Sequence, residues 1–169
     1  MRVYFDNAAT TAISEEVIET MLPVLRNLYG NPSSIHAEGR AARAALETAR
    51  KTVAQSIGAG TGEIFFTSGG TESNNMAIKC AVRDLGVQRI ITSPTEHHCG
   101  IHAIEMVQKI KGTEVVWLPV DACGRIDYEV LEVELAASGS KKTLVSLMHA
   151  NNEIGTMLDL EKVSALCKQ

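Results

Sequence analysis

The sequence has no excess of positive charge, no long apolar run and no signal-peptide core. Its 16 lysine and arginine residues stand against 20 acidic residues, which gives a formal net charge of −4. This balance gives no reason to expect a nucleic-acid partner or an anionic membrane surface. No apolar stretch approaches the length of a membrane span, and the first residues lack an apolar signal core. We therefore expect a cytoplasmic protein without direct contact to nucleic acid or membrane.

Several familiar motifs are also missing. The four cysteines show no CxxC spacing, so in a reducing compartment they are expected to be thiols: Cys80, Cys99, Cys123 and Cys167. Gly69-Gly70 does not complete a GxGxxG motif, and no GK[ST] follows these glycines. A Rossmann or Walker interpretation therefore has little support. The length of 169 residues is sufficient for one domain with a sizeable core.

Short apolar runs alternate with helical patterns along the chain. We expect strands at 63–66, 88–92, 114–118 and 142–148. Helices are expected to begin near Ser14, after residue 36, after the glycines at 69–70, after residue 97, at Asp127 and at Asp159. This alternation predicts an α/β fold with a mostly parallel sheet.

In such sheets ligands gather at the carboxyl ends of the strands. The expected topology places the loops at 67–71, 93–98 and 149–155 on that rim. At the first loop, a strand that turns through glycine into a helix leaves unpaired N–H groups beside the positive end of the helix dipole. We predict a phosphate or carboxylate site there. The alternative is an ordinary turn in which Thr71 is the N-cap.

Two side chains on the rim are candidates for a ligand. His97 has a ring that can lie over a planar ligand or exchange protons. Asn152 has an amide that can bond a ligand's polar edge, although a turn-forming role is the alternative. His98 and His102, four apart on a helix, suggest a metal, but no further ligand is apparent and we expect none. A nucleotide, a dinucleotide and a phosphorylated cofactor all stay open.

Three other polar residues have a structural interpretation. His36 is expected to be a capping or surface histidine, and Glu153 a helix-start or salt-bridging residue. Cys99, near a helix N-terminus, is expected to be a buried or incidental thiol rather than a nucleophile.

Five segments resemble one family, in the family's order: YFDNAATT at 4–11, GNPSSIHAEGR at 30–40, FTSGGTESNN at 66–75, TEHH at 95–98 and HANNEIG at 149–155. Together they make the chain similar to the N-terminal part of the cysteine desulfurases of the NifS/IscS type. These are pyridoxal-phosphate enzymes of fold type I in the class V aminotransferase superfamily. The resemblance covers nearly the whole chain.

The resemblance implies a role for each rim residue. Gly70 and Thr71 would hold the phosphate of pyridoxal 5'-phosphate through backbone N–H and hydroxyl. His97 would stack on the pyridine ring and take part in proton transfer, and Asn152 would bond the ring's phenolic oxygen. The residues that would lie near the entrance of the substrate site are Ala9, Thr10 and the loop 31–36.

The resemblance also implies a domain organisation. An N-terminal segment and helix at 1–30 would precede part of a three-layer α/β/α cofactor-binding domain at 31–169. The apolar face of the last helix stops at Lys168-Gln169 without a capping signal, so we expect a truncated domain.

Family features that carry the chemistry are not found in the sequence. It has no SxHK motif, which would supply the Schiff-base lysine, and none of its cysteines matches the persulfide cysteine. We therefore expect a fragment that is inactive alone. The full enzyme would be a homodimer that converts L-cysteine to L-alanine and passes sulfur to scaffold or acceptor proteins, for iron–sulfur clusters or tRNA thiolation. Alternatives are a selenocysteine lyase, a class V aminotransferase, or a non-enzymatic phosphate-binding module.

Overall fold

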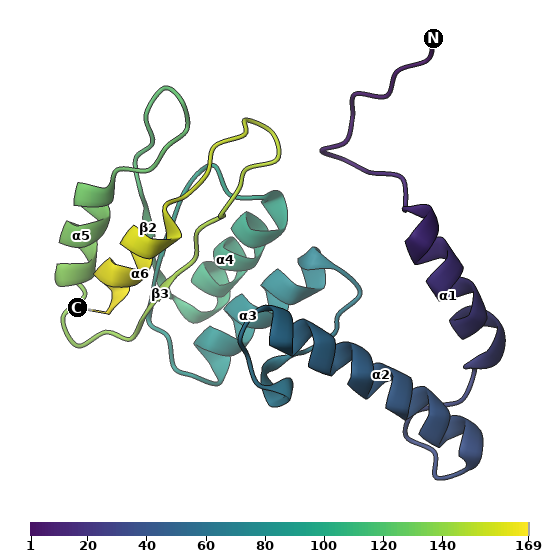
Figure 1. Ribbon diagram of the computed structural model, residues 1–169. Coiled ribbons are helices and arrows are strands. Elements are labelled where there is room, and N and C mark those ends of the chain that lie inside the picture. Colours follow the sequence, from purple (N-terminus) through teal and green to yellow (C-terminus); the bar gives the residue numbers. More distant parts are fainter. Residues whose placement is uncertain (169) are drawn as a thin grey trace. The chain divides into compact units, whose positions relative to one another are not determined.

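The computed structural model describes residues 1–168 and falls into two units, Met1–Phe66 and the part from Thr67 onward. Figure 1 shows the elements of both units in sequence colours. The predicted division after residue 30 concerns the family's cofactor-binding domain and stays a prediction.

The first unit consists of α1 (Glu15–Asn27), α2 (Ala37–Ser56) and the short 3-10 helix η1 (Thr61–Glu63). Helix α1 follows Ser14 as predicted, and acidic side chains in its first turn favour the helix dipole. His36 is the N-cap of α2, and its ring accepts the amide of Gly39 at 3.3 Å. The interpretation of His36 as a capping residue is therefore confirmed.

The strand predicted at 63–66 is wrong. The chain forms η1 and then runs without a partner strand among the described residues, so its amides and carbonyls join no sheet. The Arg50 guanidinium donates to the Ile64 carbonyl and lies 5.1 Å from the centroid of the Phe66 ring. An apolar run becomes a strand only where a neighbouring strand satisfies its backbone. Here an arginine of α2 holds the segment instead.

The second unit contains a sheet with helices between its strands. Its elements are α3 (Gly70–Arg83), β1 (Arg89–Thr92), α4 (His98–Lys111), β2 (Glu114–Trp117), α5 (Tyr128–Ala136), β3 (Thr143–Val145) and α6 (Leu160–Cys167). The strand order is β2-β1-β3, and both pairs are parallel. The predicted α/β fold with a parallel sheet is confirmed, and three of the four predicted strands are present.

The sheet is covered on both faces, because neighbouring side chains of a strand point in opposite directions. Ile90 packs with α3 and α4, and Ile91 packs with α5 and α6. Both isoleucines are fully buried. Their partners in register, Val115 with Leu144 and Val116 with Val145, divide between the same two faces. The result is a three-layer α/β/α arrangement (Figure 1).

Local capping fixes the helix ends of this unit. The Asp127 carboxylate accepts the amides of Glu129 and Val130 at the start of α5, as predicted. Asp159 caps α6 in the same way, through the amide of Lys162. Gly112 ends α4 with φ +67, a conformation that glycine adopts without a Cβ penalty. No helix in the described range 1–168 is both long and apolar enough to cross a membrane.

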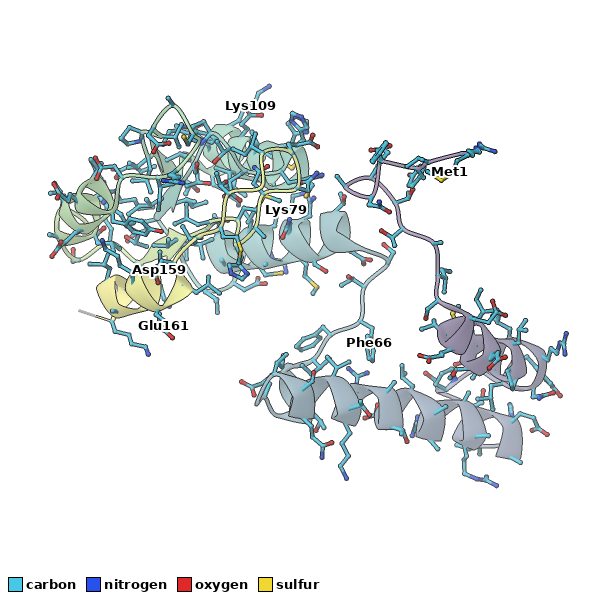
Figure 2. The ribbon with its side chains drawn as sticks, turned by 45° about the horizontal axis from the view of Figure 1, so that its top comes forward. Met1, Phe66, Lys79, Lys109, Asp159 and Glu161 are labelled. Carbon is cyan, nitrogen blue, oxygen red and sulfur yellow. The ribbon has the colours of Figure 1, made fainter. Side chains whose placement is uncertain are left out.

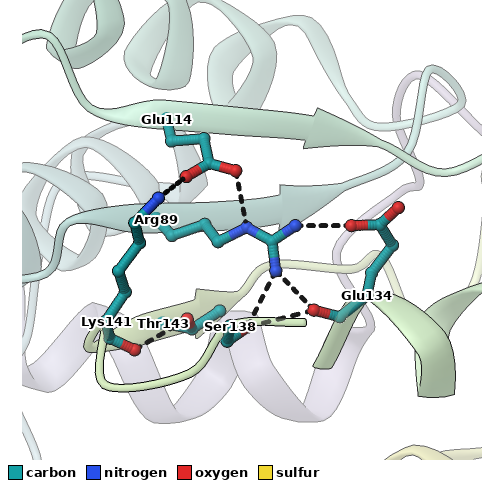
Figure 3. A network of polar contacts seen from close by, with 6 residues as sticks. All are labelled: Arg89, Glu114, Glu134, Ser138, Lys141 and Thr143. Atoms are coloured by element: carbon teal, nitrogen blue, oxygen red, sulfur yellow. Dashed lines mark hydrogen bonds and ion pairs between the residues drawn. The ribbon is translucent and has the colours of Figure 1, made fainter. Parts of the chain in front are cut away.

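A polar network holds the amino ends of the strands, around the buried Arg89 (Figure 3). Its guanidinium donates to Glu114 at 2.9 Å, to the Ser138 hydroxyl at 2.8 Å, and to both the carboxylate and the carbonyl of Glu134. The Lys141 ammonium and then Arg89 hold the pKa of Glu114 below its usual range. The network joins β1, β2, α5 and the loop before β3 at the edge opposite the predicted rim.

Candidate functional site

The rim begins at the turn into α3, where the N-cap is Gly69 and the first helical residue is Gly70. The interpretation of Thr71 as N-cap is therefore wrong, since Thr71 lies inside the first turn. The first backbone bond runs from the Ser73 amide to the Gly69 carbonyl at 3.1 Å. The amides of Gly70, Thr71 and the next residue precede it and have no helical acceptor.

The turn itself is held by its own side chains. Glu72 accepts the amide of Ser68 at 2.6 Å and the Ser68 hydroxyl at 2.7 Å, and these bonds lower the pKa of its carboxyl. The hydroxyls of Thr67 and Ser73 lie 2.6 Å apart. Within residues 1–168 the Thr71 hydroxyl makes no hydrogen bond. The turn therefore presents an unengaged hydroxyl beside unengaged amides, a donor set that suits an anion.

His97 is the N-cap of α4 and has an exposed ring. Its Nδ1 accepts the backbone amide of Cys99 at 3.1 Å and lies 2.9 Å from the Cys99 sulfur. The ring meets that of His98 edge-on, with centroids 6.3 Å apart. A cap bond through Nδ1 fixes the ring at the start of the helix and leaves Nε2 for a ligand.

Asn152 lies in the loop after β3, next to an asparagine with a different task. Asn151 donates from Nδ2 to the Thr95 carbonyl at 2.7 Å, and its Oδ1 accepts the amides of Glu153 and Ile154. The turn-forming role therefore belongs to Asn151. The Asn152 amide is exposed and donates to the Glu153 carboxylate at 2.9 Å.

A second contact joins the loops after β1 and β3. The half-buried Glu96 accepts the amide of Met148. Burial raises the pKa of the Glu96 carboxyl, and the Met148 bond opposes that shift in part. Glu96 and Asn151 thus hold together the two loops that carry His97 and Asn152.

The two loops enclose a pocket of about 300 Å³. His97 and Asn152 both line it, together with Thr95, Met148 and Glu153. Gly70 and Thr71 are not among its lining residues. Helix α3 is tied to the pocket in another way, since the Asn74 amide donates to the Cys99 sulfur at 3.1 Å. Sequence reasoning missed Glu96, Asn151 and Asn74, whose partners lie far away along the chain.

The remaining candidates have other surroundings. The rings of His98 and His102 stack with centroids 6.0 Å apart, and the described residues contain no group of three or more potential metal ligands. Thr10 lies in the first unit, and its hydroxyl is 2.6 Å from that of Tyr4. The backbone amides of Ala9 and Thr10 both donate to the Asp6 carbonyl. The loop 31–36 is also in the first unit.

The lysines of the second unit lie in different settings, since Lys141 and Lys142 directly precede β3 and others lie on helices. Lys79 and Lys109, for example, lie on α3 and α4 (Figure 2). All four cysteines are free thiols, and burial raises the pKa of Cys167.

An α/β/α unit with a histidine and an asparagine in one pocket at the carboxyl edge of a parallel sheet is a small-molecule-binding fold. The chain belongs to the aminotransferase class-V family, whose profile matches residues 3–169. Curated relatives include the cysteine desulfurase IscS of Dictyoglomus turgidum, 47% identical over 99% of this chain, and that of Methanosarcina thermophila, 44% identical over 99%. The chain spans 42% and 41% of the lengths of these two relatives.

Solved structures agree in fold. A NifS-like protein superimposes with a TM-score of 0.89 at 40% identity, covering 99% of this chain and 46% of its own. A structure described as SspA in complex with cysteine gives a TM-score of 0.86 at 35% identity, over 98% of this chain and 47% of that one. The predicted resemblance to the N-terminal part of NifS/IscS-type proteins is confirmed.

Proposed function

We propose that this chain forms the cofactor-holding part of a pyridoxal-phosphate-dependent cysteine desulfurase. The observation that carries the proposal is the single pocket shared by His97 and Asn152, which follow the neighbouring strands β1 and β3. The names of the relatives, cysteine desulfurases from several organisms, support the same activity.

The residues present fit the cofactor. Its phosphate is a dianion, and the start of α3 offers amides without helical acceptors together with the Thr71 hydroxyl. A Cβ built at Gly70 meets no atom within 4 Å, so the approach to the backbone there is open. The exposed His97 ring is suited to stacking on a planar heterocycle, and the Asn152 amide to a phenolic oxygen.

Each residue has a definite task. Gly70 and Thr71 bind the phosphate, and the helix dipole favours its charge. His97 would lie against the cofactor's ring, and its Nε2 would be the nitrogen that moves a proton, because Nδ1 accepts the Cys99 amide in the helix cap. Asn152, whose amide donates to the Glu153 carboxylate in this structure, would instead donate to the cofactor's phenolic oxygen. When bound, the cofactor supplies an electron sink for the substrate carbon.

The complete enzyme would convert L-cysteine and an enzyme thiol to L-alanine and an enzyme persulfide. It would act as a cytoplasmic homodimer and pass the persulfide sulfur to scaffold or acceptor proteins, for iron–sulfur clusters or tRNA thiolation. Because the sequence has no SxHK motif for a tethering lysine, we expect no turnover by these 169 residues alone.

Binding of pyridoxine 5'-phosphate tests the proposed phosphate grip. This analogue lacks the aldehyde and cannot react with surface lysines, so calorimetry with the purified chain measures the pocket alone. We expect Thr71→Ala to weaken binding roughly 10- to 150-fold, since a hydrogen bond to a charged group contributes roughly 1.5–3 kcal/mol. Thr20→Ala, at an exposed threonine of α1, is the matched control and should leave the affinity unchanged.

Two results would contradict the proposal. If pyridoxine binds as tightly as its phosphate, the α3 turn does not hold the phosphate group. If inorganic phosphate binds as tightly as pyridoxine 5'-phosphate, the chain is a phosphate-binding module rather than a cofactor site. Release of alanine from cysteine by the purified chain with added pyridoxal phosphate would refute the expected lack of turnover.

A further inference from the structure

The side chains of Asn74, Cys99 and His97 form a chain of hydrogen bonds from α3 to the His97 ring. Asn74, one turn after Thr71 on α3, donates from Nδ2 to the Cys99 sulfur at 3.1 Å. The Cys99 sulfur lies 2.9 Å from His97 Nδ1, which also accepts the Cys99 backbone amide at 3.1 Å. These hydrogen bonds therefore connect α3, the helix that begins with the proposed anion-binding turn, to His97 in the pocket.

The position of each proton follows from the donors. A backbone N–H always carries its hydrogen, so Nδ1 of His97 must present a lone pair to the Cys99 amide. The neutral ring then carries its proton on Nε2. The Asn74 amide donates to the sulfur, which leaves the thiol hydrogen free to be donated, and the acceptor 2.9 Å away is His97 Nδ1. The thiol S–H and the Cys99 backbone N–H then share the single lone pair of Nδ1. The alternative is a Cys99 thiolate with the proton on His97 Nδ1. The Nδ1–H would then point at the hydrogen of the Cys99 backbone amide.

We propose that Cys99 and Asn74 are positioning residues that hold His97 in the Nε2–H tautomer and fix the direction of its ring. The inference rests on the proposed function for the use of His97, but the tautomer itself is a property of the ligand-free chain. A neutral His97 with its proton on Nε2 meets a bound molecule as a hydrogen-bond donor. Because Asn74 lies on α3, a ligand that orders the α3 turn also restrains the ring.

The tautomer can be read by long-range ¹H–¹⁵N correlation NMR of the chain with labelled histidine, at a pH where His97 is neutral. A His97→Gln spectrum assigns its signals, and His98 and His102 serve as references in the same spectrum. We expect His97 to be almost wholly the Nε2–H form. Cys99→Ala should raise the Nδ1–H fraction about two- to fivefold, because a weak hydrogen bond of about 0.5–1 kcal/mol is lost.

Matched variants separate positioning from general packing. Cys99→Ser keeps a donor at the same place and should restore the wild-type fraction, and Asn74→Ala should raise it less than Cys99→Ala. Cys80→Ala, at a half-buried thiol elsewhere on α3, should change nothing. An Nδ1–H majority in the unsubstituted chain, or a Cys99→Ala spectrum identical to it, would overturn the proposal. Because no cofactor is added, this outcome is independent of the pyridoxine 5'-phosphate titration.

Discussion

Arg89 keeps only 5% of its surface exposed, and three acceptor residues from two other elements and a loop share its charge. Each of its three guanidinium nitrogens has a partner, so the cost of desolvation is offset by charge-assisted bonds. The partners Glu114 and Glu134 keep side-chain exposures of 40% and 30%. Arg83 has the opposite environment, since its pair with Asp84 is open to solvent.

Replacing Arg89 by methionine should lower the free energy of unfolding by about 3 kcal/mol, because Ser138 and two carboxylates lose their common donor. Urea denaturation followed by circular dichroism measures the change. The matched control is Arg83→Met, which removes an exposed ion pair and should change the free energy of unfolding far less than Arg89→Met. Equal losses for both variants would show that the Arg89 network does not stabilise the sheet.

At the scale of elements, the loops after β1 and β3 depend on each other through Glu96 and Asn151. Burial raises the pKa of Glu96 above its ordinary 4.5, so folding favours its neutral form. The stability that this preference contributes is fully present below pH 4.5 and is lost as the pH rises through the raised pKa. At neutral pH the buried charge therefore costs free energy.

The variant Glu96→Gln removes that charge but keeps a carbonyl oxygen for the Met148 amide. We expect its free energy of unfolding to match that of the unsubstituted chain at pH 4 and to exceed it at pH 7. Urea midpoints at the two pH values measure the difference. Glu105→Gln, at an exposed position of α4, is the control and should show the same difference at both pH values. A Glu96→Gln variant that is less stable at pH 7 would contradict this account.

Local patterns predicted most of these elements. The helix caps at Asp127 and Gly112 and the strands around Ile90 and Val115 follow from residues next to each other in the chain. The segment 63–66 has an equally apolar pattern but no partner strand, and pairing cannot be read from one segment.

The residues of the candidate site were likewise predicted only in part from the sequence. The sequence predicted His97 and Asn152 as rim residues because each follows a strand, and the shared pocket agrees with that placement. It did not predict Glu96 and Asn151 as the residues that join the loops. Their partners lie 52 and 56 residues away along the chain, and contacts at that distance depend on the packed sheet.

At the scale of the whole molecule, apolar surface is abundant. Helix α1 has no buried residue and exposes five large apolar side chains: Val17, Met21, Leu22, Val24 and Leu25. Val17, Met21 and Leu25 are spaced four residues apart and therefore lie on one side of the helix, and an exposed apolar face favours association.

We expect the chain to self-associate at micromolar concentration, which sedimentation velocity measures. The double variant Leu22→Lys with Leu25→Lys should shift the population toward monomer, because lysine ammonium groups resist burial. Lys51→Arg, which keeps the charge of an exposed residue of α2, is the control. A monomer at all concentrations for the unsubstituted chain would contradict the prediction.

The Arg89 network lies at the amino ends of the strands and the His97 pocket at their carboxyl ends, and this separation has a practical consequence. In a saturation library scored both for protein abundance and for cofactor capture, substitutions around Arg89 should reduce the two scores together. Substitutions at Thr71 and Asn152 should reduce capture alone. Variants at the amino ends of the parallel strands would then affect folding, and variants at the carboxyl ends would affect cofactor binding.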